Sequence, residues 1–231
     1  MIPFGTLFNV AMVLLGSIIG LFFKKFISSE LNKKIFFVIG LFTIVLGFSM
    51  ALKSADFMLM FLSVIGGAAC GESIQLDNTI LRCINKLKKR INIKDDKFSD
   101  AILTSFLLFC VGSMTIVGSI DEGLGKRPDI LYTKSVMDGI SSIILASTFG
   151  IGVLFSIFPM LIFQGGITIL VFYYKDFLSL ELINHISSVG GVLIIALGLK
   201  LLGYKKINPT NMLPAILLII IFYGLKVYTI A

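Results

Sequence analysis

Long, nearly uninterrupted runs of apolar residues alternate along this chain with short polar segments. Each run extends over about 17 to 22 residues, and apolar side chains occupy every face of a helix drawn through it. Runs near 20 residues match the roughly 30 Å hydrocarbon core of a bilayer. Strands of a membrane barrel would instead alternate polar and apolar positions. The pattern therefore predicts a bundle of membrane-spanning helices.

The runs predict about eight spans in one all-α transmembrane domain, residues 1–231. They cover residues 4–23, 35–52, 57–76, 99–119, 137–154, 157–174, 184–202 and 211–229. The fifth and sixth have no charge between them, and one helix through both would be about 54 Å long. We expect a break around Ser156 to Pro159, because proline disfavours a helical predecessor. The result is two short spans or a re-entrant hairpin.

Composition agrees with a lipid environment. Hydrophobic residues make up 57% of the chain and charged residues 14%, against about a quarter charged in soluble domains. The first run lacks a positive start and a small-residue cleavage site, so we interpret it as a retained span rather than a signal peptide.

The distribution of basic residues orients the spans. With the N-terminus outside, the loops after the first, third and seventh spans hold 14 of the 20 lysines and arginines. This bias predicts that both termini lie outside. It also explains the net charge of +7, so no nucleic-acid partner is expected.

The longest polar segment, residues 77–98, has the pattern of a basic amphipathic helix. Ile80, Ile84 and Leu87 fall at helical spacing, while arginines and lysines occupy the rest of the wheel. Such a helix lies at a membrane surface. We expect a cytoplasmic loop that binds anionic lipids, binds a partner protein, or serves as a connector.

Signatures of enzymes and metal sites are incomplete. Residues 122–129, "EGLGKRPD", share only a Gly-Lys pair with a phosphate-binding loop. The three cysteines do not suggest a disulfide framework, and His185 has no second histidine with which to hold a metal. We therefore expect no enzymatic activity, no cofactor and no metal.

An internal similarity suggests duplication. "FVIGLFTIVLGFSMAL" (37–52) resembles "SVGGVLIIALGLKLLG" (188–203), which aligns Gly40 with Gly191 and Gly47 with Gly198. Fainter matches around it align the first three spans with the last three. The units are five crossings apart, so their orientations would be opposite, as in the inverted repeats of many secondary transporters.

Small residues recur at four-residue spacing inside the spans. The pairs are Gly16 and Gly20, Gly67 and Gly71, and Ala146 and Gly150. This spacing lets helices approach closely. It serves packing within the chain, a homodimer face, or hinges in discontinuous helices.

Four polar residues inside the spans are candidates for a binding site, because such groups are costly in a membrane. They are Asn9, Glu72, Asp138 and Gln164. Asp138 stands at the predicted outer start of the fifth helix, where capping is the alternative role. Glu72 lies about one turn inside the third span, where snorkelling to the headgroups is the alternative. Asn9 and Gln164 would otherwise bond across helices.

Two further acids, Asp121 and Glu122, end the fourth span. We expect both to be solvated at the outer surface.

These segments resemble a known family. "GTLFNVAMVLLGSIIG", "CVGSMTIVGSIDEGL", "KSVMDGISSIILASTFGIGVLFS", "QGGITIL" and "NMLPAILL" occur here in the order found in the YqgA/YdfK family of bacterial multi-pass inner-membrane proteins. The resemblance covers nearly the whole chain. It implies a location in the bacterial cytoplasmic membrane and supplies no substrate or catalytic residue.

The leading hypothesis is a secondary transporter or exporter of a small solute. Asn9 and Gln164 would contact the solute, while Glu72 or Asp138 would bind a proton or cation. The alternative is a noncatalytic membrane scaffold or regulatory subunit that uses the basic helix and the small-residue faces.

Overall fold

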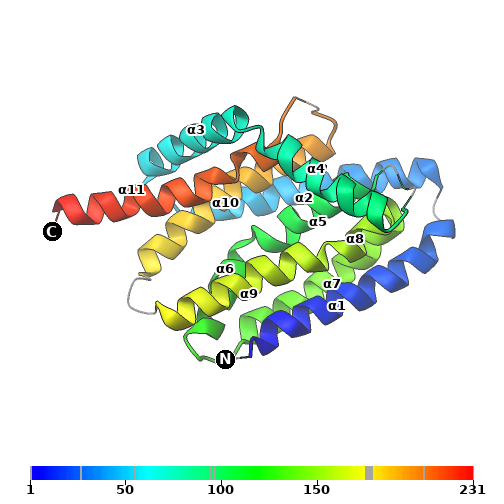
Figure 1. The fold of residues 1–231 in the computed structure, drawn as a ribbon, viewed down its shortest axis with the longest axis horizontal. Helices are drawn as coiled ribbons and strands as arrows, with labels where there is room; N and C mark the ends of the chain where they lie inside the picture. Colours follow the sequence, from blue (N-terminus) through cyan, green and yellow to red (C-terminus); the bar gives the residue numbers. More distant parts are fainter. Residues whose placement is uncertain are drawn as a thin grey trace. The chain divides into compact units, whose positions relative to one another are not determined.

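A computed structural model describes residues 2–26, 28–54, 56–93, 95, 97–174, 179–204 and 206–230. The described residues form helices joined by short connections, which confirms the predicted all-α fold (Figure 1). Lys94, Lys175 and Lys205, which contribute to the predicted charge bias, lie outside the described residues. The chain divides into two compact units, residues 1–36 with 84–178 and residues 37–83 with 179–231.

Unit 1 is built around the pairing of α1 and α7. Its elements are α1 (Phe4–Phe23), η1 (Lys24–Phe26), α5 (Phe98–Cys110), α6 (Ser113–Gly123), α7 (Asp129–Phe149), α8 (Gly152–Phe155) and α9 (Ile157–Tyr173). A Cβ atom added at Gly16 would overlap the carbonyl oxygen of Gly139, and one at Gly20 would overlap that of Ile143. The spacing of these glycines thus serves helix packing within unit 1.

The predicted span over 99–119 is broken in the structure. α5 and α6 meet at an angle of 62° around Val111 and Gly112. Backbone groups freed by a break need new partners inside a membrane. The Thr115 hydroxyl supplies one by donating to the carbonyl of Phe109 at 2.6 Å. The apolar run between residues 101 and 120 gives no sign in the sequence that a threonine hydroxyl replaces a lost backbone hydrogen bond.

The predicted break at Ser156 to Pro159 coincides with a minor interruption at Ser156, between α8 and α9, but the main turn lies earlier, at Gly150. α7 ends at Phe149, and Gly150 turns the chain with φ of +88°, a conformation that glycine adopts without steric cost. α8 and α9 then continue as one apolar segment, Gly152–Tyr173. Pro159 lies in the first turn of α9, where a missing amide donor is tolerated.

Unit 2 contains α3 (Phe57–Ser73), α10 (Leu180–Leu201), η3 (Pro209–Met212), α11 (Pro214–Ile230) and most of α2 (Ser29–Ala51). α4 (Leu76–Arg90) begins in unit 2 and ends in unit 1. Gly67 and Gly71 of α3 pack against Ala215 and Asn211, so this second glycine pair also serves packing within the chain.

The contacts between α2 and α10 are reciprocal. A Cβ atom added at Gly47 would lie 2.7 Å from the Gly191 carbonyl oxygen, and one added at Gly198, which aligns with Gly47, would lie 2.8 Å from the carbonyl oxygen of Gly40, which aligns with Gly191. Ile44 packs on Gly198 just as Ile195 packs on Gly47, with Cγ1 distances of 2.6 and 2.7 Å to the added atoms. Each contact therefore has a counterpart with the two helices exchanged.

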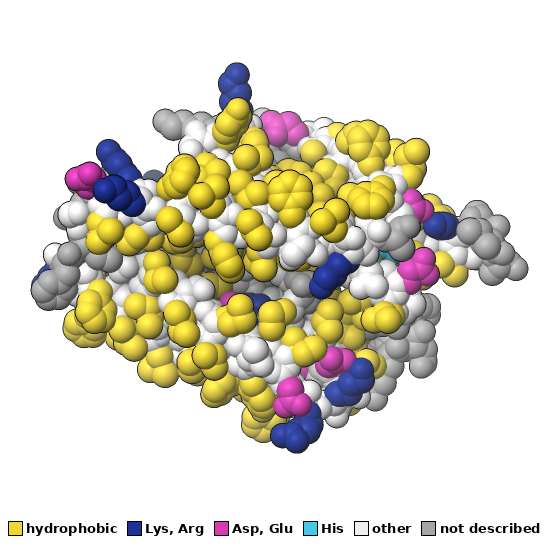
Figure 2. Space-filling view, turned by 180° about the vertical axis from the view of Figure 1, so that it is seen from behind, with side chains coloured by type: hydrophobic (Ala, Val, Ile, Leu, Met, Phe, Trp, Pro, Cys, Tyr) yellow, Lys and Arg dark blue, Asp and Glu magenta, His cyan; other side chains and the backbone are white. Residues whose placement is uncertain are grey.

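Several helices are suited to lipid. Among the described residues, five helices are long and apolar enough to cross a membrane, and the number rises to seven if each of two bent pairs forms one span. Large apolar side chains point outward from them, including Phe22, Ile162 and Leu217, which are 74%, 76% and 64% exposed. Hydrophobic side chains are spread widely over the face shown in Figure 2. A surface of this kind would be unfavourable in water.

Candidate functional site

A buried ion pair lies on α7 in unit 1. Lys134 and Asp138 are four residues apart, and Lys134 Nζ donates a hydrogen bond to Asp138 Oδ2. Only 5% and 8% of these residues are exposed. The predicted place of Asp138 at a helix start is wrong, because α7 begins at Asp129. Asp138 therefore lies in the interior of the helix, where Lys134 supplies the opposite charge.

Asn9 of α1 joins this pair to α9. Its Nδ2 atom donates to Asp138 Oδ2 at 3.1 Å and to Gln164 Oε1 at 3.1 Å. Asn9 and Gln164 are both fully buried. Three of the four predicted site residues thus form one hydrogen-bonded group, which we call the amide–acid group: Asn9, Lys134, Asp138 and Gln164.

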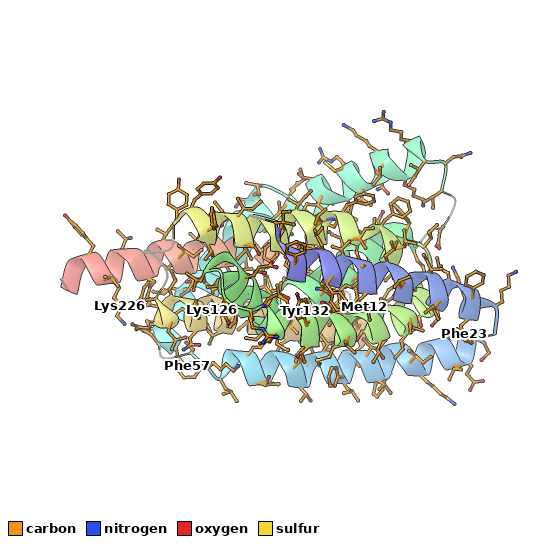
Figure 3. All side chains as sticks on the ribbon, turned by 90° about the horizontal axis from the view of Figure 1, so that it is seen from below. Met12, Phe23, Phe57, Lys126, Tyr132 and Lys226 are labelled. Atoms are coloured by element: carbon orange, nitrogen blue, oxygen red, sulfur yellow. The ribbon has the colours of Figure 1, made fainter. Side chains whose placement is uncertain are left out.

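The close packing of α1 against α7 brings Asn9 within hydrogen-bond distance of Asp138. Phe8 and Tyr132 stack edge to face with ring centroids 5.3 Å apart, and Met12 packs against Gly139. Met12 and Tyr132 mark this pair in Figure 3. Because the helices touch at glycines on the same side, Asn9 reaches the carboxylate of Asp138.

Two atoms of the amide–acid group lack a hydrogen-bond partner among the described residues. They are Asn9 Oδ1, an acceptor, and Gln164 Nε2, a donor. Buried polar atoms are paired in the great majority of proteins, so such atoms need an explanation. One explanation is that a bound polar molecule pairs with both atoms.

Glu122 forms a second buried polar group, which we call the Glu122 cage. Its Oε1 atom accepts from the Gly5 amide at 2.5 Å, and its Oε2 atom accepts from the hydroxyls of Thr6 and Thr168, each at 3.0 Å. The predicted solvation of Glu122 is wrong, since 3% of the residue is exposed. Asp121 is partly exposed and pairs with Lys126 instead, at 2.7 Å.

The Glu122 cage and the amide–acid group share two helices. Thr6 and Asn9 are three residues apart on α1, and Gln164 and Thr168 are four apart on α9. Residues at these spacings lie on one face of a helix. The Thr168 hydroxyl also lies 3.2 Å from the backbone carbonyl oxygen of Gln164. The polar contacts are therefore continuous from Glu122 to Lys134.

Lys134 and Glu122 are the charged residues of this site that the sequence interpretation missed; the hydroxyl donors Thr6 and Thr168 were also missed. Each charged residue lies near the end of an apolar run, where a charge is usually solvated. The spacing of Lys134 and Asp138 at i and i+4 was an available signal for an ion pair. The first turn of α1, which carries no acid and has Pro3 at its N-cap, was a weaker signal that another helix supplies the acceptor.

The fourth candidate, Glu72, does not take part in this group. It belongs to unit 2, where its Oε2 atom accepts from Asn211 Nδ2 at 2.6 Å. Asn211 Oδ1 accepts from the backbone amide of Asp77 at 2.7 Å. Asn211 thus connects η3 to the end of α3 and the start of α4.

The histidine, cysteines and acidic residues of the described part of the chain are dispersed. This part of the chain holds no group of three or more histidine, cysteine or acidic residues able to bind a metal ion. His185 is fully buried in unit 2 beside the Tyr223 ring, with centroids 5.4 Å apart. Cys70, Cys83 and Cys110 are free thiols.

Comparison with known proteins identifies the family. A family profile described as "Protein of unknown function (DUF554)" matches residues 4–224. The chain belongs to the DUF554 family. Within it, "Uncharacterized membrane protein YdfK" of Bacillus subtilis (strain 168) is 34% identical over 96% of this chain and 99% of its own length. "Uncharacterized protein YqgA" of Escherichia coli (strain K12) is 28% identical over 93% of each chain. No solved structure matches the chain.

Membership in the DUF554 family confirms the resemblance drawn from the sequence segments. The relative from Bacillus subtilis is named a membrane protein, and several helices of this chain are long and apolar enough to span a bilayer. This DUF554 chain is therefore a membrane protein. The function of its buried polar groups must be argued from their geometry.

Proposed function

We propose that the chain is a secondary transporter or exporter of a small polar solute in the bacterial cytoplasmic membrane. The observation that carries the proposal is the hydrogen-bonded meeting of Asn9, Asp138 and Gln164 inside unit 1. Ionisable and polar groups in transmembrane helices are rare and mark substrate and ion pathways. Asn9 and Gln164 would bind the solute, as their sequence positions predict, and Asp138 with Lys134 would orient it.

The chemistry of the group suggests the class of solute. Asn9 Oδ1 offers an acceptor and Gln164 Nε2 offers a donor, and neither has a partner among the described residues. Asp138 and Lys134 add one charge of each sign. A small molecule with both donors and acceptors, such as an amide or a zwitterion, would satisfy all four.

Inverted repeats are part of the proposal. The reciprocal contacts of α2 with α10 follow the alignment of Gly40 with Gly191 and of Gly47 with Gly198. The bond between Asn9 and Gln164 joins two residues that correspond approximately in the fainter match between the first and sixth predicted spans. Contacts that repeat when two segments are exchanged support a two-fold relationship. Transporters with such repeats bind substrate between them.

The topology proposed from the basic residues has about eight crossings and both termini outside. Reporter fusions at each end of the chain test it. An enzyme such as alkaline phosphatase, which is active only outside the cytoplasmic membrane, should be active at the C-terminus. Activity of a cytoplasm-specific reporter there would contradict the orientation.

Transport is tested with purified protein in liposomes. A panel of amino acids, amides and small organic acids is first screened for solutes that raise the thermal midpoint. The best solute is then used in counterflow, where internal unlabelled solute drives entry of labelled solute. Wild type should exchange it, and the double variant Asn9→Leu/Gln164→Leu should not.

Glu72→Gln is the matched control, because Glu72 bonds to Asn211 in unit 2. It should retain counterflow. Equal exchange by the Asn9→Leu/Gln164→Leu variant and by wild type would remove the assigned role of the amides.

A further inference from the structure

Glu122 is a buried carboxylate without an opposite charge beside it. The three groups that donate to it, the Gly5 amide and the hydroxyls of Thr6 and Thr168, are all neutral. Among the described residues, no lysine, arginine or histidine lies within ion-pair distance of it. Asp138, by contrast, has Lys134. Buried charges are usually paired with an opposite charge, so the neutral surroundings of Glu122 need an explanation.

Capping of α1 explains only half of the Glu122 cage. The Gly5 amide lies in the first turn of α1, where amides have no acceptor within the helix, and a carboxylate there also complements the helix dipole. This role needs Oε1 alone. Capping does not require the hydroxyls of Thr6 on α1 and Thr168 on α9, which both donate to Oε2.

The cage can satisfy both protonation states of Glu122. A hydroxyl is donor and acceptor at once. When Glu122 is ionised, the Thr168 hydroxyl donates to Oε2 over 3.0 Å. When Oε2 carries a proton, it can donate to Thr168, whose hydroxyl then donates to the Gln164 carbonyl oxygen 3.2 Å away. The Gly5 amide and the Thr6 hydroxyl donate in both states.

The charges around the cage are few. α1 and α9 carry no acidic or basic side chain within their bounds. The remaining elements packed against α6 are α5 and α7. Their acidic and basic residues, with those near Glu122 on its own segment, are Asp100 on α5, Asp129, Lys134 and Asp138 on α7, and Asp121, Lys126 and Arg127.

We propose that Glu122 is a reversible proton-binding site. A hydronium ion gives one proton to Oε2: one O–H bond of hydronium breaks, an O–H bond forms on Oε2, the carboxylate charge changes from −1 to 0, and a neutral water molecule is left. The Gly5 amide points its hydrogen at Oε1. Such a donor suits a protonated carboxyl group, whose C=O still accepts, but would repel a metal cation.

This site deepens the proposed function and rests on it for one consequence, which is coupling. Protonation of Glu122 turns the Thr168 hydroxyl toward the backbone of Gln164. The Gln164 side chain bonds Asn9, which bonds Asp138. The proton and the solute would therefore act on the same residue of α9.

Infrared spectroscopy tests the proton site directly, with the protein in lipid nanodiscs and the proton itself as the probe. Wild type should show the C=O stretching band of a protonated carboxyl group, which grows as the pH falls. Glu122→Gln should lose this band, and Asp138→Asn should retain it. Thr168→Val should shift its frequency, because the protonated acid loses its acceptor.

Three outcomes would overturn the proposal. The first is a pH-dependent band that Glu122→Gln leaves unchanged. The second is a Glu122 signal that responds to replacement of sodium by choline at constant pH, which would indicate a metal-cation site. The third, decisive if Glu122→Gln does not fold, is an identical carboxyl spectrum in Thr168→Val and wild type.

The two proposals fail separately. A titrating Glu122 in a protein that exchanges no solute would refute transport and leave the proton site intact. Solute exchange with no Glu122-dependent band would refute the proton site and leave transport intact.

Discussion

Lys134 and Asp138 neutralise each other one turn apart inside α7. The Lys134 ammonium also lies 6.0 Å from the centroid of the Phe109 ring, within reach of a cation–π interaction. Buried pairs of this kind are weak contributors to stability compared with apolar replacements, yet loss of one partner is costly. Their presence in a helix surrounded by apolar side chains therefore points to a role other than stability.

Lys134→Met should destabilise the protein strongly. The substitution leaves Asp138 buried without its opposite charge, which costs about 3–5 kcal/mol in comparable pairs. Unfolding of the protein in mixed micelles, followed by circular dichroism, measures the loss. Lys126→Met is the control, because the Lys126 side chain is 62% exposed and its pair with Asp121 lies at the surface; it should change little.

The double variant Lys134→Met/Asp138→Leu separates stability from function. It should recover most of the stability lost by Lys134→Met, since both charges are removed together. It should not exchange solute. A double variant as unstable as Lys134→Met would show that charge imbalance is not the cause of the loss.

Gly16→Ala should separate α1 from α7. Its methyl group would overlap Ser142 Oγ and the Gly139 carbonyl oxygen, and overpacking of this kind costs about 1–3 kcal/mol. Gly166→Ala in α9 is the matched control, because an added Cβ there meets no described atom within 4 Å. The difference in thermal midpoint between the two variants measures the effect. Equal midpoints would contradict the close approach of α1 and α7 at Gly16.

Reciprocity between α2 and α10 predicts two equivalent cross-links. In a background without native cysteines, Ile44→Cys/Gly198→Cys and Gly47→Cys/Ile195→Cys should both form disulfides, because the partners are in contact. Gly40→Cys/Gly191→Cys should not. Gly40 packs on Gly198 and Gly191 on Gly47, so Gly40 and Gly191 are displaced by seven helical residues, about 10 Å, beyond disulfide reach. Cross-linking of one predicted pair without the other would contradict the two-fold relationship.

The ion pair and hydrogen bonds of Asp56 predict a pH-dependent contribution to the stability of unit 2. The Lys226 ammonium at 2.7 Å and the amides of Leu59 and Met58 hold the pKa of Asp56 below its ordinary value. A carboxyl group whose pKa is lower in the folded state stabilises that state above its unfolded pKa, about 3.9. This stabilisation is lost as the pH falls through the folded pKa.

Lys226→Met should therefore lower the thermal midpoint at pH 7, and the difference from wild type should shrink below about pH 4. Asp56→Ala should cost about 1 kcal/mol more, because Asp56 also caps α3. A difference that persists unchanged at low pH would assign the effect of Lys226 to packing.

The membrane-spanning helices could be predicted from sequence because bilayer thickness fixes their length and composition. The run at 4–23 matches α1, and the apolar run at 157–174 ends within one residue of α9. The breaks could not be predicted. That between α5 and α6 depends on the Thr115 hydroxyl reaching the Phe109 carbonyl, and that after α7 depends on the conformation of Gly150.

The candidate site was predictable where a polar residue interrupts an apolar run. Asn9 and Gln164 stand out in this way, and the structure joins them directly. Glu122 and Lys134 do not, because a charge near the end of a span has the same sequence pattern whether it is solvated or buried. Contacts with Gly5 and Thr6, over 100 residues away along the chain, bury Glu122.

Equilibrium binding of the solute found in the screen tests the solute-binding role of the amide–acid group most directly. Calorimetry would compare wild type with Asn9→Leu and with Asn211→Leu, a control that removes a buried asparagine from unit 2. We predict that Asn9→Leu abolishes measurable binding while Asn211→Leu retains the wild-type affinity. Wild-type affinity in a folded Asn9→Leu protein would contradict a solute site at Asn9, Asp138 and Gln164.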